Sequence, residues 1–241
     1  MPRKRIILML SILLLVLPTA LVLYTLFDNR NYGLISLVMV FLALIPFLMR
    51  YEMKKPPARE WIPIVTMAAI AAVGRFAFAP LPHFKPVSAI IIVTAMVFGA
   101  EAGFLTGALA ALASNLFFGQ GPWTPWQMFA WGMIGFLAGA LAKHGFLKKK
   151  WQICLYGATT GYLYGWILNI WAASTMMMAE MSWQAFLSLY VSSFVLDSVH
   201  SISTVIFLLL IAGSWGAKLR RVQLKFGILC EANVKGPLTR N

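Results

Sequence analysis

Two ionisable side chains lie within the last long apolar run of this sequence, and they are strong candidates for chemistry. Asp197 and His200 are three residues apart, so a helix would place them on one face. Ionisable groups inside an apolar span are costly and usually face a cavity or pair together. Three interpretations follow: the two residues bind a ligand, satisfy each other structurally, or relay protons. Ser193, Ser201 and Ser203 make the stretch unusually polar, which favours a wetted face.

Cationic side chains surround a predicted exterior loop at residues 80–86. Three prolines stiffen this loop because each one fixes φ. Arg75, His83 and Lys85 form a cationic rim beside it, and such a rim would attract a ligand phosphate or carboxylate. The alternative for Arg75 is that it extends to the lipid headgroups. We predict that Arg75 and Lys85 contact a substrate.

A second exterior loop, residues 118–127, combines glycines, prolines and two tryptophans. Glycine permits unusual backbone angles and proline then rigidifies them. Trp123 and Trp126 could cover a flat, partly apolar ligand, or they could belong to an interfacial belt. The remaining predicted substrate-binding residues are amides: Asn115, Gln120 and Asn169.

The elements that position these residues must be membrane helices. The chain has 241 residues, of which 61% are hydrophobic and only 11% charged, whereas a soluble domain has about 25% charged residues. The net charge is +13. The cations lie in short clusters between apolar runs, which is the positive-inside pattern of membrane proteins and not the basic groove of a nucleic-acid-binding domain. Cys154 and Cys230 lie far apart and do not have the spacing of metal ligands. We expect no metal, cofactor or nucleic acid.

The apolar runs predict eight membrane helices with both termini in the cytoplasm. Residues 87–118 could instead form one long helix, but that would place the lysines at 148–150 outside, against the charge bias. The runs are residues 6–27, 34–49, 61–79, 87–98, 103–118, 127–142, 151–175 and 185–214. The expected organisation is a transmembrane hairpin and linker (1–59), a six-helix substrate-binding core (60–216) and a basic cytoplasmic tail (217–241).

The six-helix core resembles the S components of energy-coupling factor (ECF) vitamin importers. The most specific part is the string Gly-Gln-Gly-Pro-Trp-Thr-Pro-Trp at residues 119–126. The resemblance is closest to the cobalamin-type branch and covers about two thirds of the chain. The hairpin departs from the family's six-helix pattern. The other segments that carry the resemblance are residues 68–76, 81–86, 103–109 and 113–115, and the glycines at 132, 135 and 139.

The resemblance implies an all-α bundle in the bacterial plasma membrane that captures a vitamin from outside. It also implies a transmembrane T subunit and two cytosolic ATPases as partners, with Ala68 and Ala72 docking the T subunit. Internal helix packing is the alternative for these alanines. The sequence has no phosphate-binding loop, so energy must come from the partners.

Cobalamin is the substrate that the resemblance favours, and another vitamin or a nucleobase-like compound is an alternative. A different class of function is a stand-alone proton-coupled carrier that uses Asp197 and His200. No inverted repeat supports a carrier. A membrane enzyme is not expected, because the sequence contains neither Gly-x-Ser-x-Gly nor His-Glu-x-x-His.

Overall fold

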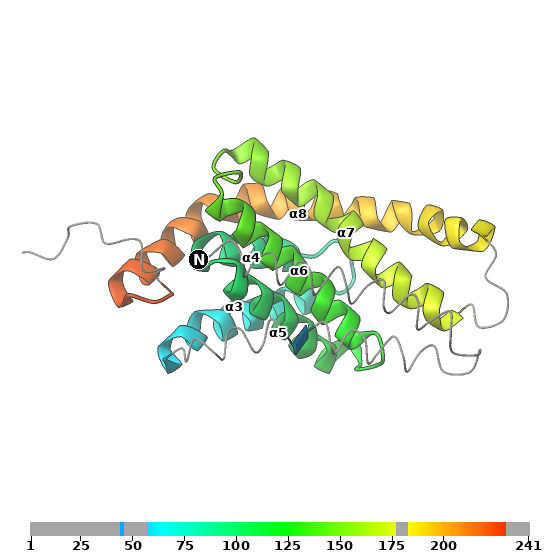
Figure 1. The fold of residues 1–241 in the computed structure, drawn as a ribbon, viewed down its shortest axis with the longest axis horizontal. Coiled ribbons are helices and arrows are strands. Elements are labelled where there is room, and N and C mark those ends of the chain that lie inside the picture. Colours follow the sequence, from blue (N-terminus) through cyan, green and yellow to red (C-terminus); the bar gives the residue numbers. More distant parts are fainter. Residues whose placement is uncertain (1–43, 46–56, 177–182, 230–241) are drawn as a thin grey trace, which may run out of the picture.

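The protein folds into a bundle of helices. The structure is a computed structural model that describes residues 44–45, 57–176 and 183–229. These residues contain helices and no strand, in agreement with the predicted all-α class. Most of the predicted hairpin (1–59) and the end of the basic tail lie outside the described residues. The helices pack along one another (Figure 1) and are α3 (Ala58–Ala77), α4 (Val87–Phe98), α5 (Ala100–Phe118), α6 (Thr124–Lys143), α7 (Lys150–Met176) and α8 (Trp183–Phe226).

The region 87–118 forms two helices that fold back on each other. Helix α4 ends at Gly99, whose φ of 94° lies in the region that favours glycine. A Cβ added to Gly103 would collide with the Cβ of Ala95. Eight residues along one straight helix would separate these positions by about 12 Å. The chain therefore reverses at Gly99, as the charge pattern predicted.

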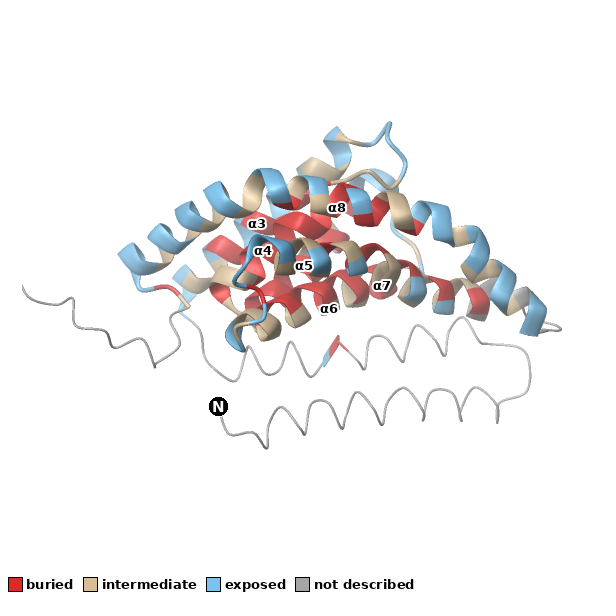
Figure 2. Ribbon diagram, turned by 90° about the horizontal axis from the view of Figure 1, so that it is seen from above, coloured by how far each residue is buried: buried red, intermediate tan, exposed pale blue. Residues whose placement is uncertain are grey.

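Helix α4 is short and lies in the middle of the bundle. Its 12 residues span about 18 Å, well short of the roughly 30 Å hydrocarbon core of a bilayer. Most of its side chains are buried, and it packs against α3, α5, α6 and α8. Figure 2 shows the buried residues gathered along the middle of the bundle. A helix enclosed by protein does not need to match the thickness of the membrane.

Small residues bring α5 and α6 into backbone contact. A Cβ on Gly107 would collide with the backbone of Trp131, and a Cβ on Gly135 would collide with the backbone of Gly103. Close backbone approach is how helices associate in lipid, where apolar burial adds little. These contacts fix the rotation of α6 about its own axis, and this rotation decides which α6 side chains point into the bundle.

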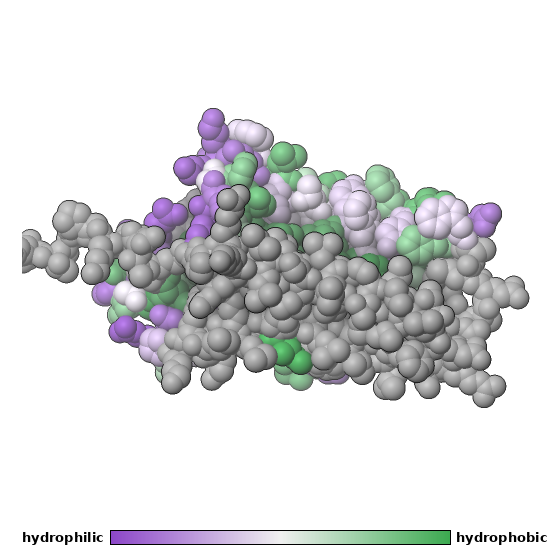
Figure 3. Space-filling view, in the orientation of Figure 1, coloured by the Kyte–Doolittle hydropathy of each residue, from purple (hydrophilic) through white to green (hydrophobic). Residues whose placement is uncertain are grey.

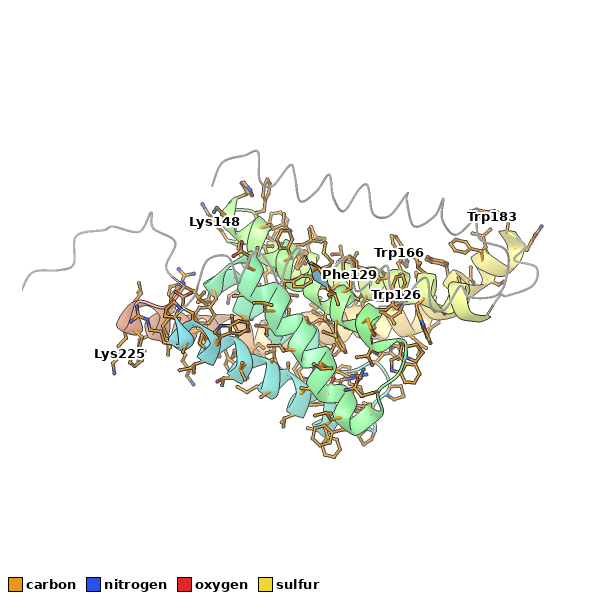
Figure 4. All side chains as sticks on the ribbon, turned by 60° about the horizontal axis from the view of Figure 1, so that its bottom comes forward. Trp126, Phe129, Lys148, Trp166, Trp183 and Lys225 are labelled. Carbon is orange, nitrogen blue, oxygen red and sulfur yellow. The ribbon has the colours of Figure 1, made fainter. Side chains whose placement is uncertain are left out.

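Helix α8 is longer than the predicted run, which ends at residue 214. It continues to Phe226 and stops before Gly227, whose φ is 58°. Lys218, Arg220 and Arg221 extend it because lysine and arginine are good helix formers. Lys148 and Lys225 lie toward one end of the bundle and Trp183 toward the other (Figure 4). Most of the hydrophilic surface visible in Figure 3 lies toward the end where α7 begins and α8 ends.

Three helices in the described residues are long and apolar enough to cross a bilayer. They are Ala58–Ala77, Ala100–Phe118 and Phe186–Phe226. Many large apolar side chains on the outside of the bundle are exposed, including Val73, Val191 and Leu210. Lipid can cover such a surface, whereas a soluble monomer rarely exposes a continuous apolar surface of this kind. These features are those of a multi-pass membrane protein.

Candidate functional site

Arg75, in the last turn of α3, points into the bundle. Its Nη1 donates hydrogen bonds to Ser114 Oγ (2.7 Å) and to Asn115 Oδ1 (2.8 Å) on α5. The guanidinium also lies over the rings of Phe118 (4.5 Å to the centroid) and Trp131 (5.0 Å). These hydrogen-bond partners carry no charge. The geometry differs from the headgroup alternative, in which Arg75 would extend away from the bundle.

Asn115 connects Arg75 to the start of α6. This buried amide accepts the arginine hydrogen bond, and its Nδ2 donates to Thr124 Oγ1 (3.0 Å) and to Gln127 Oε1 (2.8 Å). Gln120 is exposed at the edge of this group, where its Oε1 accepts from Thr124 (3.0 Å) and its Nε2 donates to a backbone carbonyl. Asn115 therefore uses both ends of its amide.

The same group reaches His200 through aromatic rings. The ring of Tyr164 lies 4.8 Å from Trp131 and 5.2 Å from His200, measured between centroids. Buried His200 forms a 2.8 Å hydrogen bond with Ser88 Oγ on α4. We call the whole set the polar network, and its members are Arg75, Ser88, Ser114, Asn115, Gln120, Thr124, Gln127, Trp131, Tyr164 and His200.

Lys85 caps a helix as well as contributing to the cationic rim. Its Nζ donates to the carbonyls of Phe78 (2.8 Å), Leu81 (3.1 Å) and Ala79 (3.4 Å), just beyond the end of α3. Burial, and then the charge of Arg75, lower the pKa of Lys85. Burial also lowers the pKa of His83, followed by the charges of Lys85 and Arg75. The three titratable groups are thus close enough to influence one another.

Asp197 and Asn169 belong to a different group, which we call the α7–α8 seam. Asn169 Nδ2 donates to Ser193 Oγ (2.8 Å), and Ser193 Oγ donates to Asp197 Oδ2 (3.0 Å). A Cβ on Gly165 would collide with the Asp197 carboxyl, and one on Gly161 would collide with the α8 backbone. The structure therefore directs Asp197 toward α7 and His200 toward α4. The hydrogen bonds of Asp197 and His200 go to separate serines, and the two do not form the mutual pair that was one interpretation.

The two loop tryptophans pack in different places. The ring of Trp123 makes an edge contact with Trp171 at 6.0 Å. Trp126 is buried in an apolar cluster with Phe104, Ala108 and Leu44. Leu44, from the predicted hairpin, thus packs on the core. These ring contacts connect both tryptophans to aromatic and apolar side chains that lie outside the polar network.

Ala68 and Ala72, the predicted docking residues, are both buried inside the bundle. Ala68 packs with Met67 and Ala71 in the main apolar core. Their burial is compatible with the internal packing that was the alternative, and docking through them stays a prediction. The large apolar side chains exposed on α3 are Ile62, Val65, Ile70, Val73 and Phe76.

The polar network thus unites Arg75, Asn115, Gln120 and His200 from the predicted site residues. The predicted residues outside the network are Lys85, Trp123, Trp126, Asn169 and Asp197. The members that sequence reasoning missed are Ser88, Ser114, Thr124, Gln127, Trp131 and Tyr164. Gln127 and Trp131 follow the Gly-Pro-Trp loop at helical spacing, so this spacing was an available signal. Ser88 and Tyr164 had none. In the part of the chain that the structure describes, no three His, Cys, Asp or Glu residues gather as metal ligands.

Comparison with known proteins supports a transport role. Residues 64–213 match the protein family described as ECF-type riboflavin transporter, S component. This match covers more than half of the 241 residues. The chain belongs to this family of ECF S components. The family consists of transporter subunits rather than enzymes. The predicted S-component identity is confirmed. The prediction of the cobalamin-type branch is not confirmed, because the matching family is the riboflavin one. No solved structure matches this S component.

Proposed function

We propose that this S component captures a vitamin in the polar network, and that riboflavin is the substrate. The observation that carries the proposal is the inward-facing Arg75, whose hydrogen-bond partners Ser114 and Asn115 are both neutral. A charge inside an apolar bundle is costly and generally marks a functional site. The remaining N–H groups of Arg75 have no acceptor among the described residues and could donate to a ligand oxygen.

Aromatic rings beside Arg75 favour a flat ligand. Phe118, Trp131 and Tyr164 lie within a few ångströms of the guanidinium or of one another. Ring stacking together with a few placed polar groups is how small-molecule sites obtain orientation and specificity. The isoalloxazine ring of riboflavin is flat and has carbonyl oxygens along one edge. The larger cobalamin would need an open pocket with few strong anchors, whereas the anchors in this bundle are several and close together.

Transport would require the partners typical of ECF systems, a T subunit and two ATPases. This S component lacks a phosphate-binding loop of its own. Ala68 and Ala72 are the proposed docking residues, and their burial means that docking through them requires α3 to rotate or shift. We place the protein in the bacterial plasma membrane with both termini cytoplasmic, because its cations cluster on the predicted inner segments.

The experiment is ligand binding and uptake with purified protein. We expect the isolated S component to bind riboflavin more tightly than cobalamin, and proteoliposomes to take it up only with the T subunit, both ATPases and ATP. Tighter binding of cobalamin than of riboflavin would show that cobalamin is the substrate. Uptake by the isolated chain under a pH gradient would instead identify a proton-coupled carrier.

A further inference from the structure

Trp131 has a buried hydrogen-bond donor that no described residue satisfies. Its side chain is only 4% exposed, and its Nε1–H has no hydrogen-bond acceptor among the described residues. An indole N–H can donate but cannot accept. Leaving such a group buried without a partner costs free energy, so an orphaned donor in a native protein needs an explanation.

The surroundings of Trp131 distinguish it from two other buried groups without an acceptor. Trp126 Nε1 lies in the apolar cluster with Phe104 and Ala108, and Ser201 Oγ lies against Gly161. The Trp131 ring, in contrast, contacts Arg75 and Tyr164. Of these three groups, only Trp131 belongs to the polar network.

The indole cannot easily move to find another partner. The backbone of Trp131 lies against Gly107, so close that a single added carbon would collide with it. This contact fixes α6 at this residue, and the Tyr164 ring and the Arg75 guanidinium pack against the side chain. An acceptor for Nε1–H must therefore come to Trp131.

We propose that Trp131 binds the substrate directly, donating its Nε1–H to an acceptor on the edge of a flat heteroaromatic ring. Arg75 and Trp131 are both donors without acceptor capacity. The ligand edge that faces them must therefore carry at least two acceptors, such as carbonyl oxygens or unprotonated ring nitrogens. A cationic ring would be repelled by Arg75. This inference rests on the proposed function and specifies the class of substrate.

The test removes the donor and keeps an aromatic ring. Riboflavin affinity is measured for the wild type, for Trp131→Phe, and for Trp166→Phe as the control, because Trp166 is an exposed tryptophan on α7. Loss of one neutral hydrogen bond predicts about three- to tenfold weaker binding for Trp131→Phe and no change for Trp166→Phe. In protein labelled with ¹⁵N at the indoles, the Nε1–H signal that disappears in Trp131→Phe should shift when riboflavin is added to the wild type. Thiamine, a cationic ring, should not bind.

Each outcome separates the inference from the function on which it rests. If riboflavin binds the wild type and Trp131→Phe equally, and the Trp131 signal does not move, the direct contact is wrong while the proposed function stands. Weaker binding with an unmoved signal would make Trp131 a packing residue and would also overturn the contact. If the wild type binds no vitamin, the proposed function fails and the inference fails with it.

Discussion

The polar network and the α7–α8 seam are both buried and both polar, but they differ in how far their hydrogen bonds are satisfied. The seam is local: Asn169, Ser193 and Asp197 join two consecutive helices, and Gly165 makes room for the carboxyl group. The network draws on all six described helices. It contains a guanidinium with neutral partners and an indole N–H with none among the described residues.

This difference separates polar groups that hold helices together from polar groups that are available to a ligand. Hydrogen bonds between membrane helices contribute modestly to their association. In the seam, Asn169 donates to Ser193 of the neighbouring helix and Ser193 donates to Asp197 of its own helix, so each of these three side chains has a partner. Unused donors, in contrast, gain an acceptor only when one arrives. Binding should therefore depend on the network, and stability on the seam.

The largest expected effect is that of Arg75→Gln on substrate binding. Glutamine keeps a polar group but loses the charge and the forked donors, and a hydrogen bond from a charged group is worth about 1.5–3 kcal/mol. We expect riboflavin affinity to fall about 100-fold, measured by titration of the purified protein.

The matched variant in the seam is Asp197→Asn. Its oxygen can still accept from Ser193, so we expect affinity to stay within about threefold of the wild type. A loss of affinity as large as that of Arg75→Gln would show that Asp197 binds the ligand, as one interpretation of the sequence holds. It would contradict the assignment of binding to the polar network and of stability to the seam.

The next effect concerns the stability of the seam. A Cβ at Gly161 would meet the backbone of Asp197 and Ser201, whereas the nearest atoms to one at Gly165 all belong to the Asp197 carboxyl group. Gly161→Ala should cost about 2 kcal/mol through overpacking, seen as a lower thermal midpoint in detergent. Molecules that remain folded should bind ligand normally.

The rescue experiment identifies the cause. Shortening the colliding side chain with Asp197→Ala should restore stability to Gly165→Ala, because the nearest colliding atoms there are those of the carboxyl group. It should not restore Gly161→Ala, where backbone atoms collide. Equal rescue of both variants would contradict the geometry of the seam.

The smallest effect is the pH dependence contributed by His83 at the rim. Because the pKa of His83 is lowered in the folded protein, the unfolded chain binds a proton more readily once the pH falls below about 6.5. Stability should therefore decrease as the pH falls from about 7.5 toward 5.5, by less than about 1 kcal/mol from this residue. His83→Asn should flatten that slope, since asparagine tolerates the φ of 56° found at this position. Thermal midpoints measured across this range check the result, and identical slopes would contradict it.

Much of the helical architecture was predictable from residue types alone. Run length and hydropathy located the helices, and the lysines at 148–150 required the reversal that the structure places at Gly99. Chain-local signals suffice for such features because helix formation and membrane crossing depend on consecutive residues. The polar candidates Arg75, Asn115 and His200 were predictable because polar side chains are rare in apolar runs.

The partners of these side chains depended on tertiary structure. Arg75 meets Asn115 forty positions later, and His200 meets Ser88 from a helix far back in the chain. Asp197 and His200, which appear paired in the sequence, bond to separate serines: Asp197 bonds to Ser193 of its own helix and packs against Gly165 of α7, whereas His200 bonds to Ser88 of α4. Packing such as that of Gly107 on Trp131 sets the rotation of each helix about its axis. That rotation depends on the neighbouring helices, so the sequence of one helix cannot determine it alone.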